Sequence, residues 1–203
     1  MLDKPRKRPR QDRSRNTVDV LLEAAAQMFS KEGLSTTTDR IAERAGMSVG
    51  TLYQYFPNKQ AMLYSLAERH LIESGRRLGA VLSDLRRTLP PFEVTMRTIL
   101  DVVMDLHSSP PAVHALMHRL VLRHIEELEA VQAFEEYLAT EVAFHLERCG
   151  RGGDDSMMTA RAVIHGVDAQ VHRVRLWHPV TTDSLLELVC RLAPENSRMP
   201  SLD

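Results

Sequence analysis

Apolar residues recur along most of this chain at intervals of three and four, the spacing that places them on one face of an α-helix. The first such stripe predicts a helix over about 13–31, ended by Gly33, and consists of Val18, Leu21, Leu22, Ala25 and Phe29. The chain has nine glycines, and runs of β-branched residues are scarce. The pattern therefore predicts an all-α protein.

Capping residues, glycines and prolines divide the remaining sequence into further helices. Eight more are expected: over about 37–44 and 49–55, after Pro57 to about 85, from Pro91 to about 107, from Pro111, within 120–148, and over 155–177 and 182–192. The first three helices are predicted to form a compact unit, and the later ones a larger body. We therefore expect a basic arm over 1–12, a helix-turn-helix domain over 13–60 and a helical domain over 61–203.

Residues 35–63 have the composition of a helix-turn-helix that reads DNA. Gly46 suits the tight turn between the two short helices, and Ser48 and either Thr37 or Thr38 are good N-caps. The helices keep small polar groups and tyrosines for their outward side. The residues expected to contact DNA are Thr37, Thr38, Ser48, Val49, Gly50, Thr51, Tyr53, Gln54, Tyr55, Lys59, Arg13 and Arg15.

These side chains suit different parts of a DNA duplex. Gly50 lets the backbone approach the groove, Thr51 and Val49 can touch a thymine methyl, and Gln54 can pair with an adenine edge. The two tyrosines and Lys59 are placed for phosphates. An alternative is that both tyrosines belong to the core. Since they flank Gln54 on one helix, at least one of them is expected to face solvent.

Charge is distributed unevenly along the chain. Residues 4–15 contain seven Lys/Arg against Asp12 alone, and residues 1–60 hold 11 Lys/Arg against seven Asp/Glu. The remainder holds 15 against 20, and the whole chain has a net charge of -1. A basic end on an acidic body favours a DNA-binding module joined to a part that does not touch DNA. The alternative is a solvated tail that only keeps the protein in solution.

Two other motifs point to chemistry but have structural explanations. Gly46–Gly50 matches the GxSxG motif of hydrolases, but that motif needs a preceding strand, and a helix is expected here. His114 and His118 are spaced for a metal, yet no Cys or carboxylate cluster completes a ligand set. We therefore predict no catalytic residue, no cofactor and no metal site.

Membrane and secretion signals are missing from the sequence. No apolar stretch approaches the roughly 20 residues that cross a bilayer, and no apolar segment follows the basic N-terminus. Cys149 and Cys190 lack a CxxC spacing and suit a reducing compartment. These features predict a cytoplasmic protein.

The stretch TTTDRIAERAGMSVGTLYQYFPNKQAML, with AAAQMFSKEGLSTTT before it, resembles the TetR family of transcriptional regulators. The resemblance covers about residues 13–65 and implies a homodimer that binds a palindromic operator, usually as a repressor released by a small-molecule effector. Asp39 departs from the family pattern, in which many members have Arg or another non-acidic residue at this position. An acidic group there repels phosphate, so the second helix is not expected to contact a base directly. A TetR-like activator and a nonspecific architectural DNA-binding protein remain alternatives.

The resemblance also implies an apolar effector cavity in the helical body and a dimer interface built by the last two helices. Expected cavity residues are Met96, Leu100, Met104, His107, Met117, Leu120, Phe144 and Trp177. Expected interface residues are Val163, Gly166, Val167, Val171, Val174, Leu185, Leu188 and Val189. The sequence identifies neither the effector nor the operator.

Overall fold

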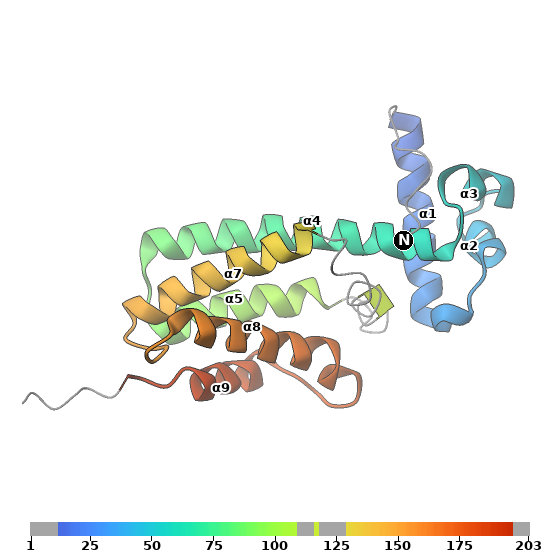
Figure 1. The fold of residues 1–203 in the computed structure, drawn as a ribbon. Helices are drawn as coiled ribbons and strands as arrows, with labels where there is room; N and C mark the ends of the chain where they lie inside the picture. The colour runs from blue at the N-terminus through green and yellow to red at the C-terminus, as the bar shows by residue number, and fades with distance from the viewer. Residues whose placement is uncertain (1–11, 109–115, 118–128, 197–203) are drawn as a thin grey trace, which may run out of the picture. The chain divides into compact units, whose positions relative to one another are not determined.

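The computed structural model describes residues 12–108, 116–117 and 129–196 (Figure 1). Their regular structure is helical apart from one isolated β-bridge between Arg151 and Glu195. This confirms the predicted all-α class. The chain divides into two compact units: unit 1 is Met1–Glu73 with Ser108–Glu129, and unit 2 is Ser74–His107 with Ala130–Asp203.

The described part of unit 1 up to Glu73 contains three α-helices, one 3₁₀ helix and the first turns of a fourth α-helix. They are α1 (Asp12–Glu32), the 3₁₀ helix η1 (Gly33–Ser35), α2 (Thr38–Arg44), α3 (Val49–Tyr55) and the start of α4 (Lys59–Thr88). α2 packs on both α1 and α3. The fully buried large side chains at the centre of this unit are Leu21, Phe29, Ile41, Leu52, Phe56 and Met62.

The turn between α2 and α3 is fixed by its backbone. Gly46 has a φ of 66°, in the left-handed region that glycine adopts without strain. The Gly46 amide donates to Glu43 O at 3.0 Å, and the Met47 amide donates to Ala42 O at 2.9 Å. These two bonds form a Schellman motif, which satisfies the last carbonyls of α2. The predicted glycine turn is confirmed.

The unit boundary differs from the boundary expected after residue 60. It falls within α4, between Glu73 and Ser74. The reason is that the first turns of α4 supply Ala61, Met62, Leu63 and Ala67 to the core of unit 1. The sequence predicted the boundary at the start of the helix. In the structure, the first turns of α4 pack in unit 1 and the rest of the helix belongs to unit 2, so the boundary lies within α4.

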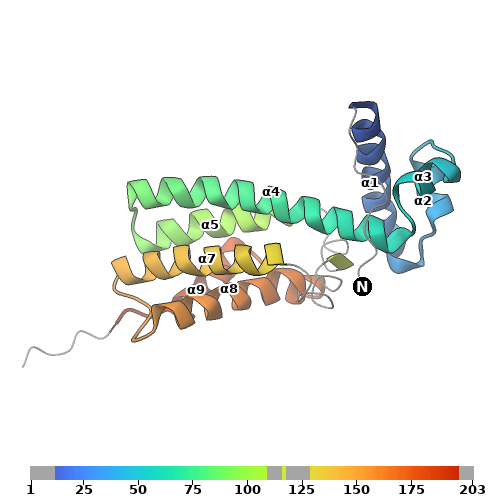
Figure 2. The ribbon, with the colours of Figure 1, turned by 45° about the horizontal axis from the view of Figure 1, so that its top comes forward.

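Unit 2 is a helical bundle formed by the rest of α4 with α5 (Phe92–Leu106), α7 (Glu129–Arg148), α8 (Ser156–His172), the 3₁₀ helix η3 (Val174–Leu176) and α9 (Thr182–Leu192). α9 packs against α5 and α8 (Figures 1 and 2). The main core of unit 2 combines apolar side chains of α5, α7, α8 and α9. Leu100, Leu146, Val163 and Val189 are among its buried residues.

One predicted helix end is wrong. The helix expected to reach Trp177 ends at His172 and gives way to η3. The valine spacing continues through Val171 and Val174, and the sequence offers no stop signal before Pro179. The helix expected from Pro111 falls mostly outside the described residues. Among the described residues, no helix is long and apolar enough to cross a membrane.

Candidate nucleic-acid interface

α3 presents one face to the core and the opposite face to solvent. Leu52 and Phe56 are buried, and Val49 and Tyr55 pack partly against the same core. Gly50, Tyr53 and Gln54 are exposed. One tyrosine therefore faces solvent and the other packs on the core, as the argument from helical geometry predicted. Of the α3 residues expected to meet DNA, Gly50, Tyr53 and Gln54 therefore form the exposed face, while Val49 and Tyr55 pack partly on the core.

Both short helices of the motif begin at a hydroxyl cap. Ser48 Oγ accepts a hydrogen bond from the Thr51 amide at 3.0 Å, and Thr37 Oγ1 accepts one from the Arg40 amide at 3.3 Å. These bonds confirm Ser48 as a cap and identify Thr37, rather than Thr38, as the cap of α2. Each cap satisfies an amide that the helix itself leaves unpaired.

Thr38 instead joins the two helices through its side chain. Its Oγ1 lies 3.0 Å from the Tyr53 hydroxyl, so a hydrogen bond links the start of α2 to the exposed side of α3. A second hydroxyl pair, Ser48 Oγ and Thr51 Oγ1, lies 2.8 Å apart. These bonds hold the exposed hydroxyls in fixed positions, which favours binding without a large ordering cost.

Three basic side chains of the motif are bound within the protein. Arg40 Nη2 lies 2.7 Å from Glu32 Oε1, and Arg44 Nε donates to Gln27 Oε1 at 2.7 Å. Lys59 Nζ donates to the carbonyls of Leu34 at 2.5 Å and Thr36 at 3.1 Å. Lys59 therefore ties the start of α4 to η1 and to Thr36, the residue that follows it. Its contact with phosphate stays a prediction.

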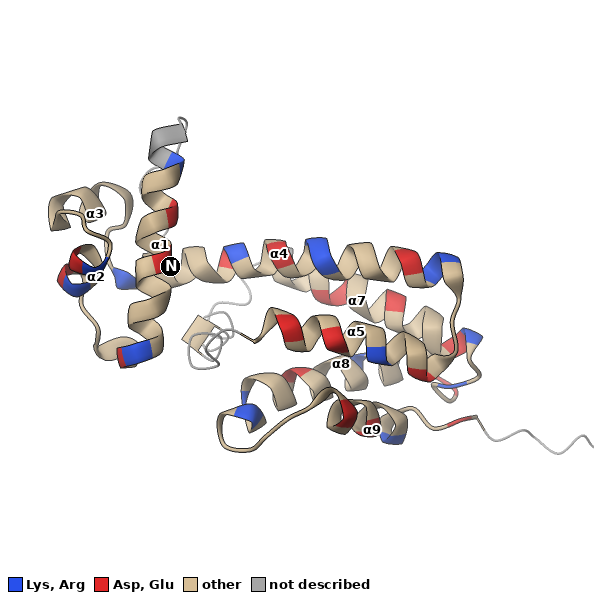
Figure 3. Ribbon diagram, turned by 180° about the vertical axis from the view of Figure 1, so that it is seen from behind, with Lys and Arg blue, Asp and Glu red and all other residues tan. Residues whose placement is uncertain are grey.

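The charged residues of the two short helices all lie on α2, where both signs occur. α3 carries no charged residue, whereas α2 carries residues of both signs (Figure 3). Asp39 is exposed in the first turn of α2, where a carboxylate is favoured by the helix dipole. Arg13 and Arg15 lie in the first turns of α1, within the helix expected over 13–31. Their contact with DNA stays a prediction.

The partners of the α2 arginines were missed by sequence reasoning. Glu32 is the last residue of α1, and Gln27 lies one turn earlier. The pairs are separated by eight and 17 positions along the chain and cross between helices. Neither a helical spacing nor a motif reports such a pair, because it depends on how α1 and α2 pack.

Ser48 has a structural role in the segment that matches GxSxG. It lies between two helices and caps α3, so the strand that a nucleophile elbow requires does not precede it. Among the described residues, no three or more His, Cys, Asp or Glu side chains are grouped so that they could hold a metal. His114 and His118 lie outside the described residues.

The residues expected to line an effector cavity belong to different clusters of the described structure. Met96 and Leu100 are buried in the core of unit 2 and Met104 packs against it, while Met117 belongs to the core of unit 1. Trp177 is 83% exposed. Helical spacing identifies a buried face but not what that face packs against, so a cavity lined by these residues stays a prediction. Leu120 lies outside the described residues.

The two remaining predicted cavity residues also have partners within unit 2. His107 is buried; its Nδ1 lies 2.7 Å from Val103 O, and its ring contacts that of His172 edge-on at 4.7 Å. The guanidinium carbon of Arg86 lies 3.9 Å from the centre of the Phe144 ring. Both side chains therefore hold helices of this unit together.

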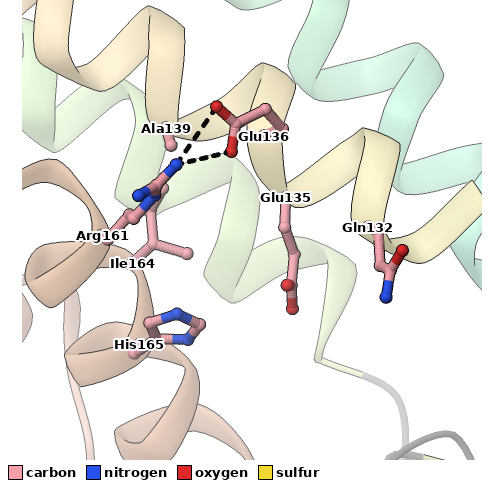
Figure 4. Close-up of a pocket in the computed structure, with 7 residues that line it drawn as sticks. All are labelled: Gln132, Glu135, Glu136, Ala139, Arg161, Ile164 and His165. Carbon is pink, nitrogen blue, oxygen red and sulfur yellow. Dashed lines mark hydrogen bonds and ion pairs between the residues drawn. The ribbon is translucent and has the colours of Figure 1, made fainter. Parts of the chain in front are cut away.

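A small polar pocket lies between α7 and α8 (Figure 4). One wall is an ion pair in which Arg161 Nη2 lies 2.9 and 3.2 Å from the two carboxylate oxygens of Glu136. Its volume is about 180 Å³, below the roughly 300 Å³ of ordinary ligand sites. It contains none of the expected cavity residues; the lining is Gln132, Glu135, Glu136, Ala139, Arg161, Ile164 and His165.

The residues expected at a dimer interface are largely in the core of their own chain. The buried members are Val163, Val167, Val171, Leu185 and Val189, while Val174 packs against the same core. Gly166 faces α9, where an added Cβ would lie 3.2 Å from Leu192 and 3.7 Å from Leu188. These residues join α8 and α9 within one chain. Little of their area is left for a partner, which corrects the expectation.

Comparison with known proteins locates the strongest similarity in unit 1. The family model described as "Bacterial regulatory proteins, tetR family" matches residues 21–66. The uncharacterized HTH-type transcriptional regulator YvkB of Bacillus subtilis (strain 168) is 37% identical over 76 residues, which are 37% of this chain and 40% of that protein. The matched residues 21–66 include the helix-turn-helix formed by α2 and α3.

Two further similarities extend beyond unit 1. The nucleoid occlusion factor SlmA of Glaesserella parasuis serovar 5 (strain SH0165) is 27% identical over 134 residues, 66% of this chain and 63% of that protein. The matched segments thus span less than two thirds of either curated relative. The structure of the fatty acid degradation regulator FadR from Bacillus halodurans superposes with a TM-score of 0.63 and 20% identity, covering 92% of this chain and 96% of that one.

Proposed function

Since the chain belongs to the TetR family of bacterial regulatory proteins, we propose that it is a DNA-binding transcriptional regulator that acts in the cytoplasm. The observation that carries this proposal is the exposed face of α3. It is held on a capped helix-turn-helix scaffold, with Leu52 and Phe56 buried beneath it. A rigid short helix with an uncharged polar face suits the major groove of DNA.

The chain acts as a homodimer on a palindromic operator, because two copies related by a two-fold axis present two recognition helices to two half-sites. Exposed apolar side chains on α8 and α9 support these helices as the interface. Met158 is 61% exposed and Leu192 is 38% exposed. Their outward faces, rather than the buried valine stripe, then meet the partner.

A small-molecule effector releases the protein from its operator by favouring a spacing of the two α3 helices that no longer fits the half-sites. A buried polar atom in unit 2 supports a bound molecule. Ser74 Oγ is buried, and no hydrogen bond engages it in the described part of the chain. An unpaired buried hydroxyl is costly, so a bound molecule with a polar group is one way to satisfy it.

Competition binding tests this function. The full chain is titrated against the intergenic DNA beside its own gene, with random-sequence duplex as competitor at fixed physiological salt. A specific regulator is expected to prefer its site by about 10³-fold or more. A ratio near one would reject the regulator in favour of a nonspecific DNA-binding protein. A candidate effector is identified by release of the bound DNA.

The similarity to a nucleoid occlusion factor over 134 residues supports a second candidate. In that case the chain binds many chromosomal sites rather than a few promoters. Mapping its occupancy across the genome separates the two: a regulator, whether repressor or activator, is concentrated beside the genes whose transcription changes when it is deleted. Sites spread over the chromosome without such changes favour the second candidate.

A further inference from the structure

The outermost positions of α3 are Gly50 and Gln54. They are four residues apart and therefore lie one above the other on the helix surface. Both are exposed, and Leu52 lies between them on the opposite, fully buried side. If α3 enters a groove of DNA with Leu52 facing the protein core, Gly50 and Gln54 are the residues of the helix that lie deepest in that groove.

Gln54 differs from its polar neighbours because its amide is not engaged. Thr51 and Tyr53 share their hydroxyls with Ser48 and Thr38, and the two arginines of α2 are held by Glu32 and Gln27. No hydrogen bond or ion pair engages Gln54 among the described residues. Its amide therefore offers one donor and one acceptor group to an external partner.

Gly50 has no packing reason within the protein to lack a side chain. A Cβ built on it would meet only Ser48 Oγ, at 3.7 Å, an ordinary contact distance. Glycine weakens a helix relative to alanine. The missing side chain instead leaves space on the outside of α3, directly beside Gln54, where another molecule's surface can come close to the backbone.

We propose that Gln54 reads an adenine in each operator half-site, and that Gly50 lets α3 approach closely enough for it to do so. An amide donor and acceptor match the N7 and N6 groups of adenine in the major groove. Guanine is most often read by arginine or lysine, and α3 has neither. This inference rests on the proposed function, since it assumes that α3 enters the major groove.

Selection of duplexes from a randomised pool tests the role of Gln54. Wild-type protein is expected to enrich a half-site with adenine at one fixed position. Gln54→Arg is expected to change that position to guanine while leaving the rest of the half-site unchanged. Ser83→Arg is the matched control, because it adds the same charge at an exposed position of α4 in unit 2 and is expected to leave the selected sequence unchanged.

Different outcomes of this selection test base reading by Gln54 and sequence-specific DNA binding by the protein. If the wild-type and Gln54→Arg proteins enrich the same half-site, with no base changed between them, the reading of a base by Gln54 is overturned. The proposal would also be overturned if the wild-type protein selected guanine or cytosine, instead of adenine, at the position that Gln54→Arg changes. Failure of the wild-type protein to enrich any sequence would instead reject the sequence-specific regulator.

Gly50→Ala tests the close approach. Affinity for the selected duplex is expected to fall at least tenfold at fixed salt, while the urea midpoint of unfolding stays the same or rises. Gly79→Ala is the control: it makes the same change within helix α4, where the new Cβ would lie 3.8 Å from the Tyr137 hydroxyl. Unchanged affinity of the Gly50→Ala protein would overturn this part of the proposal.

Discussion

Two helical glycines, Gly50 and Gly166, have different reasons to lack a side chain. At Gly166 an added Cβ would lie 3.2 Å from Leu192, so the packing of α8 on α9 explains the glycine. At Gly50 the nearest atom would be 3.7 Å away, and nothing in the protein explains it. The residue type is the same, and only its surroundings distinguish a packing glycine from one that faces a partner.

His145 is a fully buried histidine with one nitrogen paired and the other unpaired. Arg148 Nε donates to its Nδ1 at 2.8 Å, so the proton of the neutral ring is on Nε2. Within the described structure no acceptor reaches that Nε2. Burial, and then the charge of Arg148, lowers the pKa of His145 from 6.5 to about 4. The side chain is therefore held neutral in the folded protein.

This lowered pKa predicts a loss of stability in mild acid. Between pH 6.5 and about 4 the unfolded chain binds a proton at His145 that the folded chain does not, so the free energy of unfolding falls as the pH falls. The full effect is on the order of 3 kcal/mol. His145→Gln keeps an acceptor for Arg148 but does not titrate. The free energy of unfolding, measured with urea across this pH range, is expected to depend less on pH in the variant than in the wild type. An equal pH dependence in both proteins would contradict the prediction.

At the scale of the elements, local signals explain why some helices were predicted well and others were not. α2 and α3 are bounded by Thr37, Gly46 and Ser48, whose effects act within a few residues, and their predicted limits agree with the structure. The end of α8 has no such signal. It is set by packing, so the apolar spacing carried the prediction beyond His172.

The same distinction applies to the candidate site. The cap residues and the exposed face of α3 follow from helical periodicity, which the sequence contains. The bonds that hold Arg40, Arg44 and Lys59 connect different elements and depend on tertiary packing. The predicted cavity lining has the same limit: a stripe of methionines and leucines indicates burial, but not whether the neighbour is a ligand or another helix.

Lys59 provides a prediction about how the elements of unit 1 are joined. Lys59→Met keeps most of the side chain's length but leaves the carbonyls of Leu34 and Thr36 without this donor. We expect the free energy of unfolding to fall by about 1–3 kcal/mol, measured by urea denaturation. Lys31→Met, at an exposed position in the last turn of α1, is the control and is expected to have little effect.

DNA binding by the Lys59→Met protein separates the two roles of this lysine. If Lys59 only joins the start of α4 to the chain before α2, the salt dependence of DNA affinity stays as in the wild type. Unchanged stability together with a weaker salt dependence would instead identify Lys59 as a phosphate contact, as the sequence first indicated.

At the scale of the whole molecule, the proposed dimer can be disrupted at Leu192. A charge at this partly exposed position of α9 is expected to prevent a second chain from packing there, because an unpaired charge is costly to bury. Sedimentation of Leu192→Glu should give a mass near the 23.0 kDa of one chain, and wild type about twice that. Val94→Glu, at a 53% exposed position of α5, is the control. A dimer in both variants would place the interface elsewhere.

The positive charge of the DNA-binding region comes from the N-terminal residues, which lie outside the described structure. Residues 1–11 contain five Lys/Arg and one Asp, whereas residues 12–60 contain six Lys/Arg and six Asp/Glu. Among the six, Arg40 and Lys59 are already bound to a carboxylate and to carbonyls. Attraction to the phosphates is therefore expected to depend on residues 1–11 more than on the folded motif.

Deleting residues 1–11 should weaken binding to every DNA sequence and flatten its dependence on salt. Each phosphate contact contributes about 0.9 to the slope of log affinity against log salt, so the loss of five contacts lowers the slope by about 4.5 per chain. The measurement is a titration of operator and random duplexes at several salt concentrations. Replacing the five basic residues with Gln should have the same effect, whereas shuffling the order of residues 2–11 should have none, because the effect depends on charge. An unchanged slope after deletion would assign the phosphate contacts to the folded motif instead.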